Sequence, residues 1–418
     1  MSRKNAQRIC LVTPGHLTST PRLLKEATAL VAAGYQIHVV SVDHYPPNSP
    51  LDRALLAETG WPATQLPRSP RALGVLRSGL QRIARRLPGR LRYRSLLARA
   101  HFADSARLAR AAASVPADYY IGHCLAALPA VAHAARRRGV GFGFDLEDHH
   151  ETETVDVERS PVLRATVRDI IRTYLPAARH VTAAAPLIAD AIAKDYSVRP
   201  SVILNVFPLD QAPAAPATPG PVGRDRPAQL YWFSQTVGPN RGLEEMIPVL
   251  ARLATPCELC LRGHVDPSFV RQLSALAAAA GLHRPIRFLG FAPSREMVRL
   301  AATADLGLAS ELCVPENRNL CLTNKVFVYV LAGLPQVLTP TRAQQQLATD
   351  LGPAGMLADL ADPAFAAAQI DAYFASPERV AAARQHAWHL GQTRYNWERE
   401  QDLFLHAVHA AIGGPSTP

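Results

Sequence analysis

The sequence has few cysteines for its length, and they do not form a disulfide framework. Six cysteines are scattered over 418 residues, which is typical of a protein kept in a reducing compartment. Cys257 and Cys260 form a C-x-x-C pair. A zinc ribbon needs a second ligand pair, and none follows at a suitable spacing. The segment 257–263 alternates like a strand, whereas a thioredoxin-like pair begins a helix, so the pattern favours packing over metal or redox chemistry.

Long apolar runs are also missing. No segment approaches the roughly 18 uninterrupted apolar residues of a membrane-spanning helix. The opening segment runs from two basic residues directly into a short apolar strand and a Pro-Gly turn. It lacks the apolar stretch and small-residue cleavage site of a secretory signal. We therefore expect a cytoplasmic protein without a membrane span.

Acidic residues are scarce in one region. The net charge is +11, and between Arg68 and Arg110 arginines alternate with leucines while Asp104 is the single acid. This pattern predicts a basic amphipathic helix on the surface, which could dock on an anionic membrane at its inner face. A solvated helical face is the alternative. Few aromatic residues interleave with these arginines and no recognised module is present, so nucleic acid is not expected as a partner.

Apolar strands and helical patterns alternate along the chain. This rhythm predicts an α/β protein with two Rossmann-like, doubly wound parallel sheets facing a cleft. Ligands of such sheets bind outside the carboxyl ends of the strands. The first turn lacks a G-x-G-x-x-G, which disfavours a dinucleotide cofactor. A Pro/Ala-rich stretch marks a linker; the expected parts are residues 1–209, the linker 210–227, residues 228–390, and a helix within 391–418.

The densest polar cluster follows the predicted strand 141–145. It is the run Asp145-Leu-Glu-Asp-His-His-Glu-Thr-Glu153. Crowded acids and histidines perturb one another's pKa, which suits general-base work on a hydroxyl. The same residues could hold a metal, or the acids could stabilise the first turn of a helix. The presence of two histidines favours catalysis or substrate contact over capping.

Two polar loops follow predicted strands in the second half. In the segment 231–244 a glycine-bearing loop with Arg241 leads into a helix, whose amides could form an anion pocket for a diphosphate. An ordinary turn with a surface arginine is the alternative. In the segment 310–325 the loop ends at a helix with Lys325 in its first turn. A cation there is unfavourable next to the positive end of the helix dipole unless an anion is bound. The alternative is that these are ordinary solvated charges of a loop. Glu311 and Glu316 could accept hydrogen bonds from sugar hydroxyls.

Together these strings resemble the GT-B glycosyltransferases of the family 4 type. The resemblance runs from Arg8 to about Ala411 and depends on the order and spacing of several motifs. These are a Pro14-Gly15 turn, a D-x-E-D-x-H block at 145–150 with Glu153, N-x-F-P at 205–208, W-F-S-Q-T-x-G-P-x-R-G-L-E at 232–244, and Asn317-Arg318 with L-T-N-K-x-F-x-Y at 322–329 and A-G-L-P at 332–335.

The resemblance implies a transfer of sugar from a nucleotide-diphosphate-sugar to a glycan or lipid-linked acceptor, in cell-surface polysaccharide synthesis, with no obligatory metal or cofactor. It implies that the donor binds the C-terminal domain and the acceptor the N-terminal domain, and that the C-terminal helix crosses back to the first domain. The implied catalytic residues are His150, Asp148 and Glu147. The implied donor-binding residues are Gly238, Arg241, Glu311, Glu316, Asn317, Arg318, Asn324 and Lys325, and the acceptor side comprises Gly15, His16, His123 and Glu153.

The sequence departs from the family at one position. Many members carry paired glutamates eight residues apart, where this chain has Leu320 and Val328. The ribose contact must then come from another residue, with Glu311 or Glu316 as candidates. Two other functions fit the same architecture: a non-hydrolysing sugar-nucleotide epimerase, and an inactive binding or scaffold subunit.

Overall fold

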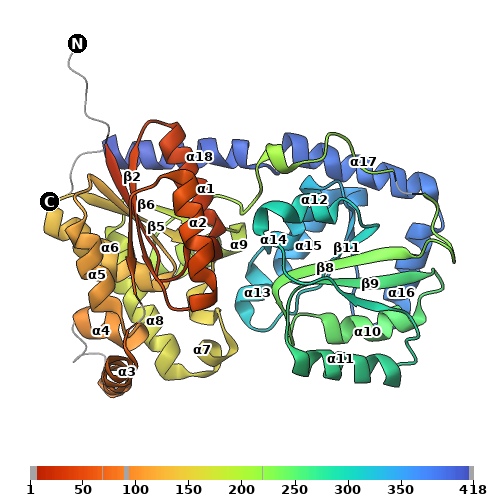
Figure 1. Cartoon of the computed structure of the whole chain (residues 1–418), viewed down its shortest axis with the longest axis horizontal. Helices are drawn as coiled ribbons and strands as arrows, with labels where there is room; N and C mark the ends of the chain where they lie inside the picture. Colours follow the sequence, from red (N-terminus) through yellow and green to blue (C-terminus); the bar gives the residue numbers. More distant parts are fainter. Residues whose placement is uncertain (1–6, 68, 89–93, 219, 414–418) are drawn as a thin grey trace, which may run out of the picture. The chain divides into compact units, whose positions relative to one another are not determined.

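The computed structural model describes residues 7–67, 69–88, 94–218 and 220–413. These residues form two compact units. The first comprises residues up to Leu204 together with Pro315–Asn317 and the chain from Gln401, and the second comprises Asn205–Val314 and Arg318–Glu400. Each unit is an α/β body with its own parallel sheet (Figure 1).

The first unit contains a seven-stranded parallel sheet in the order β3-β2-β1-β4-β5-β6-β7. Its central strands are apolar runs buried on both faces, as expected for parallel strands covered by helices. The strands are β1 (Arg8–Val12), β2 (Gln36–Val42), β3 (Ala63–Leu66), β4 (Tyr119–His123), β5 (Gly141–Leu146), β6 (His180–Ala183) and β7 (Ser201–Val202).

The order of the strands places helices on both faces of this sheet. The chain moves from β1 to β3 in one direction and then crosses to β4 and continues in the other, so right-handed crossovers put the two sets of helices on opposite faces. The helices are α1 (Pro21–Ala32), α2 (Ser49–Thr59), α3 (Arg71–Arg86), α4 (Arg94–His101), α5 (Ser105–Ser114), α6 (Leu128–Arg138), α7 (Val155–Arg159), α8 (Pro161–Tyr174) and α9 (Pro186–Tyr196).

The second unit contains a six-stranded parallel sheet in the order β10-β9-β8-β11-β12-β13. Trp232 on β8 is fully buried in its core, where α10 and α16 pack together against the sheet. The strands are β8 (Ala228–Val237), β9 (Cys257–Val265), β10 (Ile286–Phe288), β11 (Leu306–Ala309), β12 (Gln336–Leu338) and β13 (Gly355–Leu357).

The helices of the second unit also form two layers. Figure 1 shows α10 and α11 on one side of β8 and β9, with α12, α14 and α15 on the other. The helices that lie wholly in this unit are α10 (Leu243–Arg252), α11 (Pro267–Ala279), α12 (Met297–Ala301), α14 (Asn324–Leu331), α15 (Arg342–Leu351), α16 (Pro363–Phe374) and α17 (Pro377–Thr393). Two further helices are divided between the units: α13 (Glu316–Leu320) begins in the first, and α18 (Trp397–Gly413) belongs to the first from Gln401 onward.

The predicted α/β fold with two doubly wound sheets is confirmed. The segment 210–227 contains a short 3-10 turn at Leu209–Gln211 and, among its described residues, no α-helix or strand. Both cysteines of the C-x-x-C pair are buried on β9. None of the helices in the described ranges is both long enough and apolar enough to span a membrane.

Candidate functional site

The acidic and histidine-rich loop follows β5 at the carboxyl edge of the first sheet. The end of β5 continues into Glu147 and Asp148 and then a 3-10 turn at His150–Thr152. Glu151 anchors this loop, because its buried carboxylate accepts hydrogen bonds from the Tyr196 hydroxyl on α9 and from Arg168 on α8 at 2.7 Å. The loop is thus held by two helices that flank the sheet.

His150 lies at the centre of this loop with one ring nitrogen engaged and one free. Its Nδ1 is 2.8 Å from Oε2 of Glu153. Its Nε2 is buried and has no hydrogen-bond partner among the described residues. Burial lowers the pKa of His150, but the hydrogen bond and charge of Glu153 outweigh burial, so the pKa lies above its usual value. With the Nδ1 proton donated to Glu153, Nε2 keeps a lone pair that can accept a proton.

Two more acids of the loop have perturbed pKa values. Burial and the neighbouring Asp148 raise the pKa of Glu147 to about 7. Burial and the charge of Glu153 raise the pKa of Asp148. Clusters of buried groups with such shifts are typical of functional sites.

Lys25 on α1 is a further residue of this cluster, and the sequence analysis did not single it out. Burial and the neighbouring Arg22 lower its pKa to about 7, while Glu147 acts in the opposite direction. Lys25 is thus a second group of this cluster, beside Glu147, whose pKa lies near neutrality. The signal was present in the sequence, because the first turns of a helix that follows β1 lie at the carboxyl edge of the sheet.

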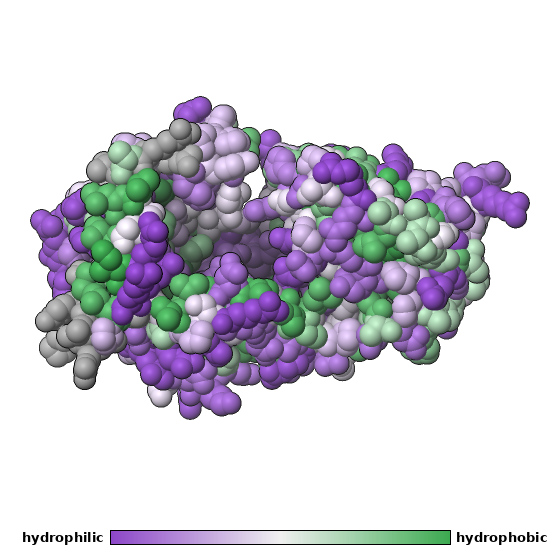
Figure 2. Space-filling view, turned by 90° about the horizontal axis from the view of Figure 1, so that it is seen from below, coloured by the Kyte–Doolittle hydropathy of each residue, from purple (hydrophilic) through white to green (hydrophobic). Residues whose placement is uncertain are grey.

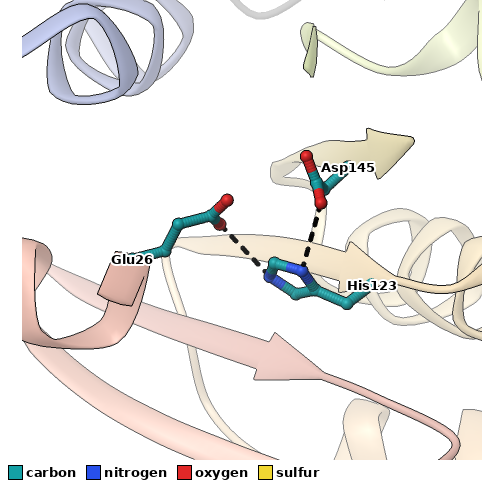
Figure 3. Close-up of side chains that lie close together, drawn as sticks. All are labelled: Glu26, His123 and Asp145. Atoms are coloured by element: carbon teal, nitrogen blue, oxygen red, sulfur yellow. Dashed lines mark ion pairs between the residues drawn. The ribbon is translucent and has the colours of Figure 1, made fainter. Parts of the chain in front are cut away.

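Beneath the loop, His123 lies between two carboxylates. Figure 3 shows its ring between Glu26 and Asp145. Nε2 is 3.2 Å from Glu26 Oε2, and Nδ1 is 3.6 Å from Asp145 Oδ2. Burial lowers the pKa of His123, but the two carboxylates raise it to about 10. His123 is therefore an imidazolium inside the protein and 1% exposed.

Arg22 completes this buried charge cluster. Its Nε and one terminal nitrogen donate to the two oxygens of Asp145 at 2.8 and 2.6 Å. The other terminal nitrogen donates to the carbonyl of Ile203 at 2.7 Å. Two cations, Arg22 and His123, thus balance two carboxylates.

Glu26, His123 and Asp145 could approach a metal ion by geometry alone, because one ligand atom from each lies within 4.8 Å of the others. The guanidinium of Arg22 nevertheless occupies both oxygens of Asp145, and a metal would add charge to a cluster that is already balanced. These residues do not fit a metal site.

Gly15 and His16 lie at the carboxyl end of β1, but His16 has both ring nitrogens occupied. The backbone amide of Tyr45 donates to Nε2 at 3.0 Å, so the proton lies on Nδ1, which is 2.9 Å from Asp52. His16 is 1% exposed. Of these histidines, His16 and His123 are fixed in the interior, whereas His149 and His150 of the loop each keep a buried Nε2 without a hydrogen-bond partner in the described chain. They differ in the partner of Nδ1, which is the Thr152 hydroxyl for His149 and the Glu153 carboxylate for His150.

In the second unit, Arg241 lies beside the start of α10. Its guanidinium donates to the Ser234 hydroxyl at 3.1 Å. Burial, followed by the charge of the neighbouring Arg318, lowers the pKa of Arg241, while Glu311 acts in the opposite direction. Gly242 is the N-cap residue of α10 with φ +74°, and a Cβ at this position would lie 2.8 Å from the carbonyl oxygen of Ser310. Amides at a helix start together with two arginines form a setting that suits an anion.

Lys325 lies in the first turn of α14, as predicted, and its partner is a protein carboxylate. Nζ is 2.5 Å from Oε1 of Glu311 and 5.2 Å from the centre of the Trp232 ring. The backbone of Glu311 is fixed by Thr339, which accepts from its amide and donates to its carbonyl. Lys325 and Glu311 are both buried. Val328, at the position of the expected glutamate, is fully buried in α14.

The remaining predicted donor residues are divided between the units. Gly238, Arg318 and Asn324 belong to the second unit, where Arg318 donates to the carbonyl of Asn240 and Asn324 accepts from Asn205 at 2.6 Å. Glu316 and Asn317 belong to the first unit. There, Asn317 donates to Asp148 and accepts from the amide of His149, both at 2.7 Å.

No model of a known protein family matches the chain, and no curated protein matches its sequence. Many solved structures match its fold. HepE of Anabaena, solved with UDP and glucose, has 16% sequence identity and a TM-score of 0.68, over 97% of this chain and all of that one. Sucrose-phosphate synthase of Thermosynechococcus elongatus has 14% identity and a TM-score of 0.67, over 96% of this chain and 98% of that one.

A third match is TarM of S. aureus, solved as a mutant with UDP, Fondaparinux and a GlcNAc-glycerol. It has 9% identity and a TM-score of 0.65, over 98% of this chain and all of that one. The chain therefore has the two-sheet GT-B fold of these proteins, as the sequence motifs predicted.

Proposed function

We propose that this protein is a glycosyltransferase that moves a sugar from a nucleotide-diphosphate-sugar to a glycan or lipid-linked acceptor in polysaccharide synthesis. The observation that carries the proposal is the His150–Glu153 pair, in which Nδ1 is engaged at 2.8 Å while the buried Nε2 has no hydrogen-bond partner in the described chain. Such a pair is suited to take a proton from a hydroxyl group.

In the proposed reaction, the oxygen of the acceptor hydroxyl bonds to the anomeric carbon of the donor sugar. The bond between that carbon and the diphosphate oxygen breaks, and the nucleoside diphosphate leaves with the electron pair. The proton of the hydroxyl passes to Nε2 of His150. Glu153 stabilises the imidazolium that forms, because its carboxylate lies on Nδ1.

The second unit is assigned to the donor. Arg241, the amides at the start of α10 and Lys325 would stabilise the negative charge that develops on the leaving diphosphate. HepE and TarM were solved with UDP, which makes a UDP-sugar the first donor to test. A loop acid with a raised pKa, Glu147 or Asp148, is assigned to orient the acceptor.

We further propose that α3 holds the protein on the inner face of an anionic membrane. Val75, Leu76, Leu80 and Ile83 on α3 are 69, 62, 44 and 59% exposed, and Arg82 and Arg86 are exposed beside them. Figure 2 shows an apolar strip at the left of the view, where α3 lies, bordered by hydrophilic residues. Exposed apolar side chains next to arginines are the chemistry of interfacial helices. Arg68, Arg90 and Arg92 of the predicted basic stretch lie outside the described residues.

The test of the enzyme proposal is a transfer assay with UDP-glucose and other nucleotide sugars against a pool of oligosaccharide acceptors. The His150→Ala variant is expected to lose activity by about 100-fold or more, as for the loss of a general base. His389→Ala, an exposed histidine on α17, serves as the matched control and should remain active. Unchanged transfer by His150→Ala would refute the role of His150, and donor turnover without any acceptor would point to an epimerase instead.

A further inference from the structure

A pocket in the first unit lies apart from the loop that follows β5. Its volume is about 900 Å³, within the range of small-molecule sites. It is lined by residues of α4, α5, α6 and α8 and by the amino end of β5, where Gly141 and Phe142 form part of the wall. None of the residues assigned above to donor, acceptor or catalysis lines it, because β5 carries those groups at its opposite end.

The lining of this pocket is basic. It includes Arg99, Arg110, Arg136 and Arg179, and among its described lining residues none is acidic. The structure gives Arg99, Arg110 and Arg136 no ion pair within the described chain, and Arg179 donates to the carbonyl of Ala411 at 3.3 Å. Arg99, Arg110 and Arg136 are exposed, so solvent screens the repulsion among these groups, and a phosphate would supply the negative charge that the lining lacks.

Helix dipoles explain why two of these arginines occupy their positions, but they do not explain the positions of the other two. Arg99 and Arg136 lie in the last turns of α4 and α6, where a cation is favourable in any protein. Arg110 lies within α5, away from its last turn, and Arg179 directly precedes β6. Their convergence on the same cavity is therefore specific to the pocket.

A buried hydroxyl in the wall of the pocket lacks a partner. Ser105, the first residue of α5, is 4% exposed, and its hydroxyl has no hydrogen-bond partner in the described chain. A buried hydroxyl costs free energy until it finds such a partner. His133 also lines the pocket, and burial, followed by the charges of Arg136 and Arg137, lowers its pKa.

We propose that this pocket binds a phosphate-bearing ligand, held by Arg110, Arg136 and Arg179 with Ser105 as a hydrogen-bond partner. Guanidinium groups match phosphate oxygens in planar, paired hydrogen bonds. The rings of Phe142 and Tyr174 and the alanines of α5 and α6 supply an apolar wall for the rest of the ligand. The inference does not depend on sugar transfer.

The phosphate has two possible sources, a soluble phosphate ester or a phospholipid headgroup. The pocket includes residues of α4, which packs against α3, so a lipid headgroup would reach it from the surface that we assign to the membrane. Glycerol 3-phosphate and dihexanoyl phosphatidylglycerol, kept below its micellar concentration, share the phosphate and differ in the acyl chains. Calorimetry with both probes separates the sources.

The test compares two double variants with the same change in charge. Arg110→Glu/Arg136→Glu removes two lining arginines, and Arg137→Glu/Arg172→Glu removes two exposed arginines of α6 and α8 that do not line the pocket. We expect at least a tenfold loss of affinity in the first pair and less than a twofold change in the second. No binding of either probe to the full-length protein, or an equal loss in both pairs, would overturn the proposal.

A third variant tests the cavity itself without changing charge. Ala132→Trp places a large ring in the pocket lined by Ala132 and should reduce binding at least tenfold while circular dichroism shows an intact fold. Unaltered binding in this variant would overturn the placement of the ligand inside the pocket. Equal affinity for the two probes identifies a soluble ester, and at least tenfold tighter binding of the lipid identifies a headgroup; either result supports the site.

Discussion

Lys325 Nζ lies 2.5 Å from Glu311 Oε1 within the second unit. The two residues are 5% and 4% exposed. Lys325 lies in the first turn of α14, so its ammonium group is close to the positive end of the helix dipole. The carboxylate of Glu311 offsets both of these positive charges. The anion that the position of Lys325 suggested is therefore supplied by the protein itself, and a bound diphosphate would share Lys325 with Glu311.

Replacing Glu311 by Gln should destabilise the protein. The change leaves the ammonium of Lys325 buried without its counter-ion, at a cost of about 3–5 kcal/mol in the free energy of unfolding. Urea denaturation measures this loss. The double variant Glu311→Gln/Lys325→Met removes both charges and should recover most of the stability; equal stability of the single variant and the wild type would refute the pair as a structural element.

Arg241→Ala should weaken the binding of UDP by about tenfold or more, since it removes a charged hydrogen-bond donor beside the amides of α10. Isothermal titration calorimetry gives the affinity. Arg252→Ala, at the far end of the same helix, removes an equal charge and should leave the affinity unchanged. Equal effects of the two variants would mean that Arg241 contributes only to the overall electrostatic potential of the unit and does not contact UDP.

The pair His150–Glu153 predicts a definite pH dependence of transfer. His150 must be unprotonated to act as a base, and Glu153 raises its pKa. The acid limb of kcat/KM should therefore have its midpoint above the usual histidine pKa of about 6.5. Glu153→Gln removes the anion, lowers the pKa and should move this limb to lower pH. Asp156→Asn, an exposed acid on α7, is the control. A limb that stays in place in Glu153→Gln would contradict the assignment of the base.

Gly242→Ala should destabilise the second unit by about 1–2 kcal/mol or more from the positive φ alone. The added Cβ would also lie 2.8 Å from the carbonyl oxygen of Ser310, so the start of α10 must move and UDP affinity should fall with stability. Thermal unfolding and calorimetry measure the two effects. Gly281→Ala is a control with a positive φ and open space around the Cβ; an equal loss of UDP affinity there would exclude the steric explanation.

Contact of α3 with a membrane can be tested with vesicles. Val75→Asp/Ile83→Asp places charge on the exposed apolar side of α3 and should abolish sedimentation with phosphatidylglycerol vesicles, and binding of the wild type should fall steeply with salt. Phe365→Asp, at a residue of α16 that is 58% exposed in the second unit, should have no effect. Binding that is absent or insensitive to salt in the wild type would exclude the proposed docking.

The sequence predicted the two sheets well because their central strands are short apolar runs between helical patterns. The predicted strand at 141–145 coincides with β5 (Gly141–Leu146) to within one residue. One edge strand of each sheet, β3 and β13, was missed. Strand β3 has the sequence Ala-Thr-Gln-Leu and is half-buried, so it carries no apolar signal, and β13 is three residues that begin with Gly355. Edge strands such as these are defined by their neighbours rather than by their own residues.

The sequence predicted where the polar residues of the candidate site lie in the fold, but not which partners hold them. The carboxyl ends of the strands indicated where the polar residues of both sheets would gather, and His150 and Arg241 lie there. Spacing could not show that His16 is held by Asp52, nor that His123 lies between Glu26 and Asp145. These partners come from distant parts of the chain. Which histidine keeps an unpaired ring nitrogen therefore depends on the packing of the folded interior.

The cluster of Arg22, Glu26, His123 and Asp145 has a consequence for how this protein can change over time. Its charges cancel inside the first unit, so replacing any one of the four leaves a net charge in the interior. A substitution that removes Arg22 must be accompanied, almost simultaneously, by one that removes Glu26 or Asp145. Across related sequences these four positions should therefore vary as a set, with the intermediate combinations absent.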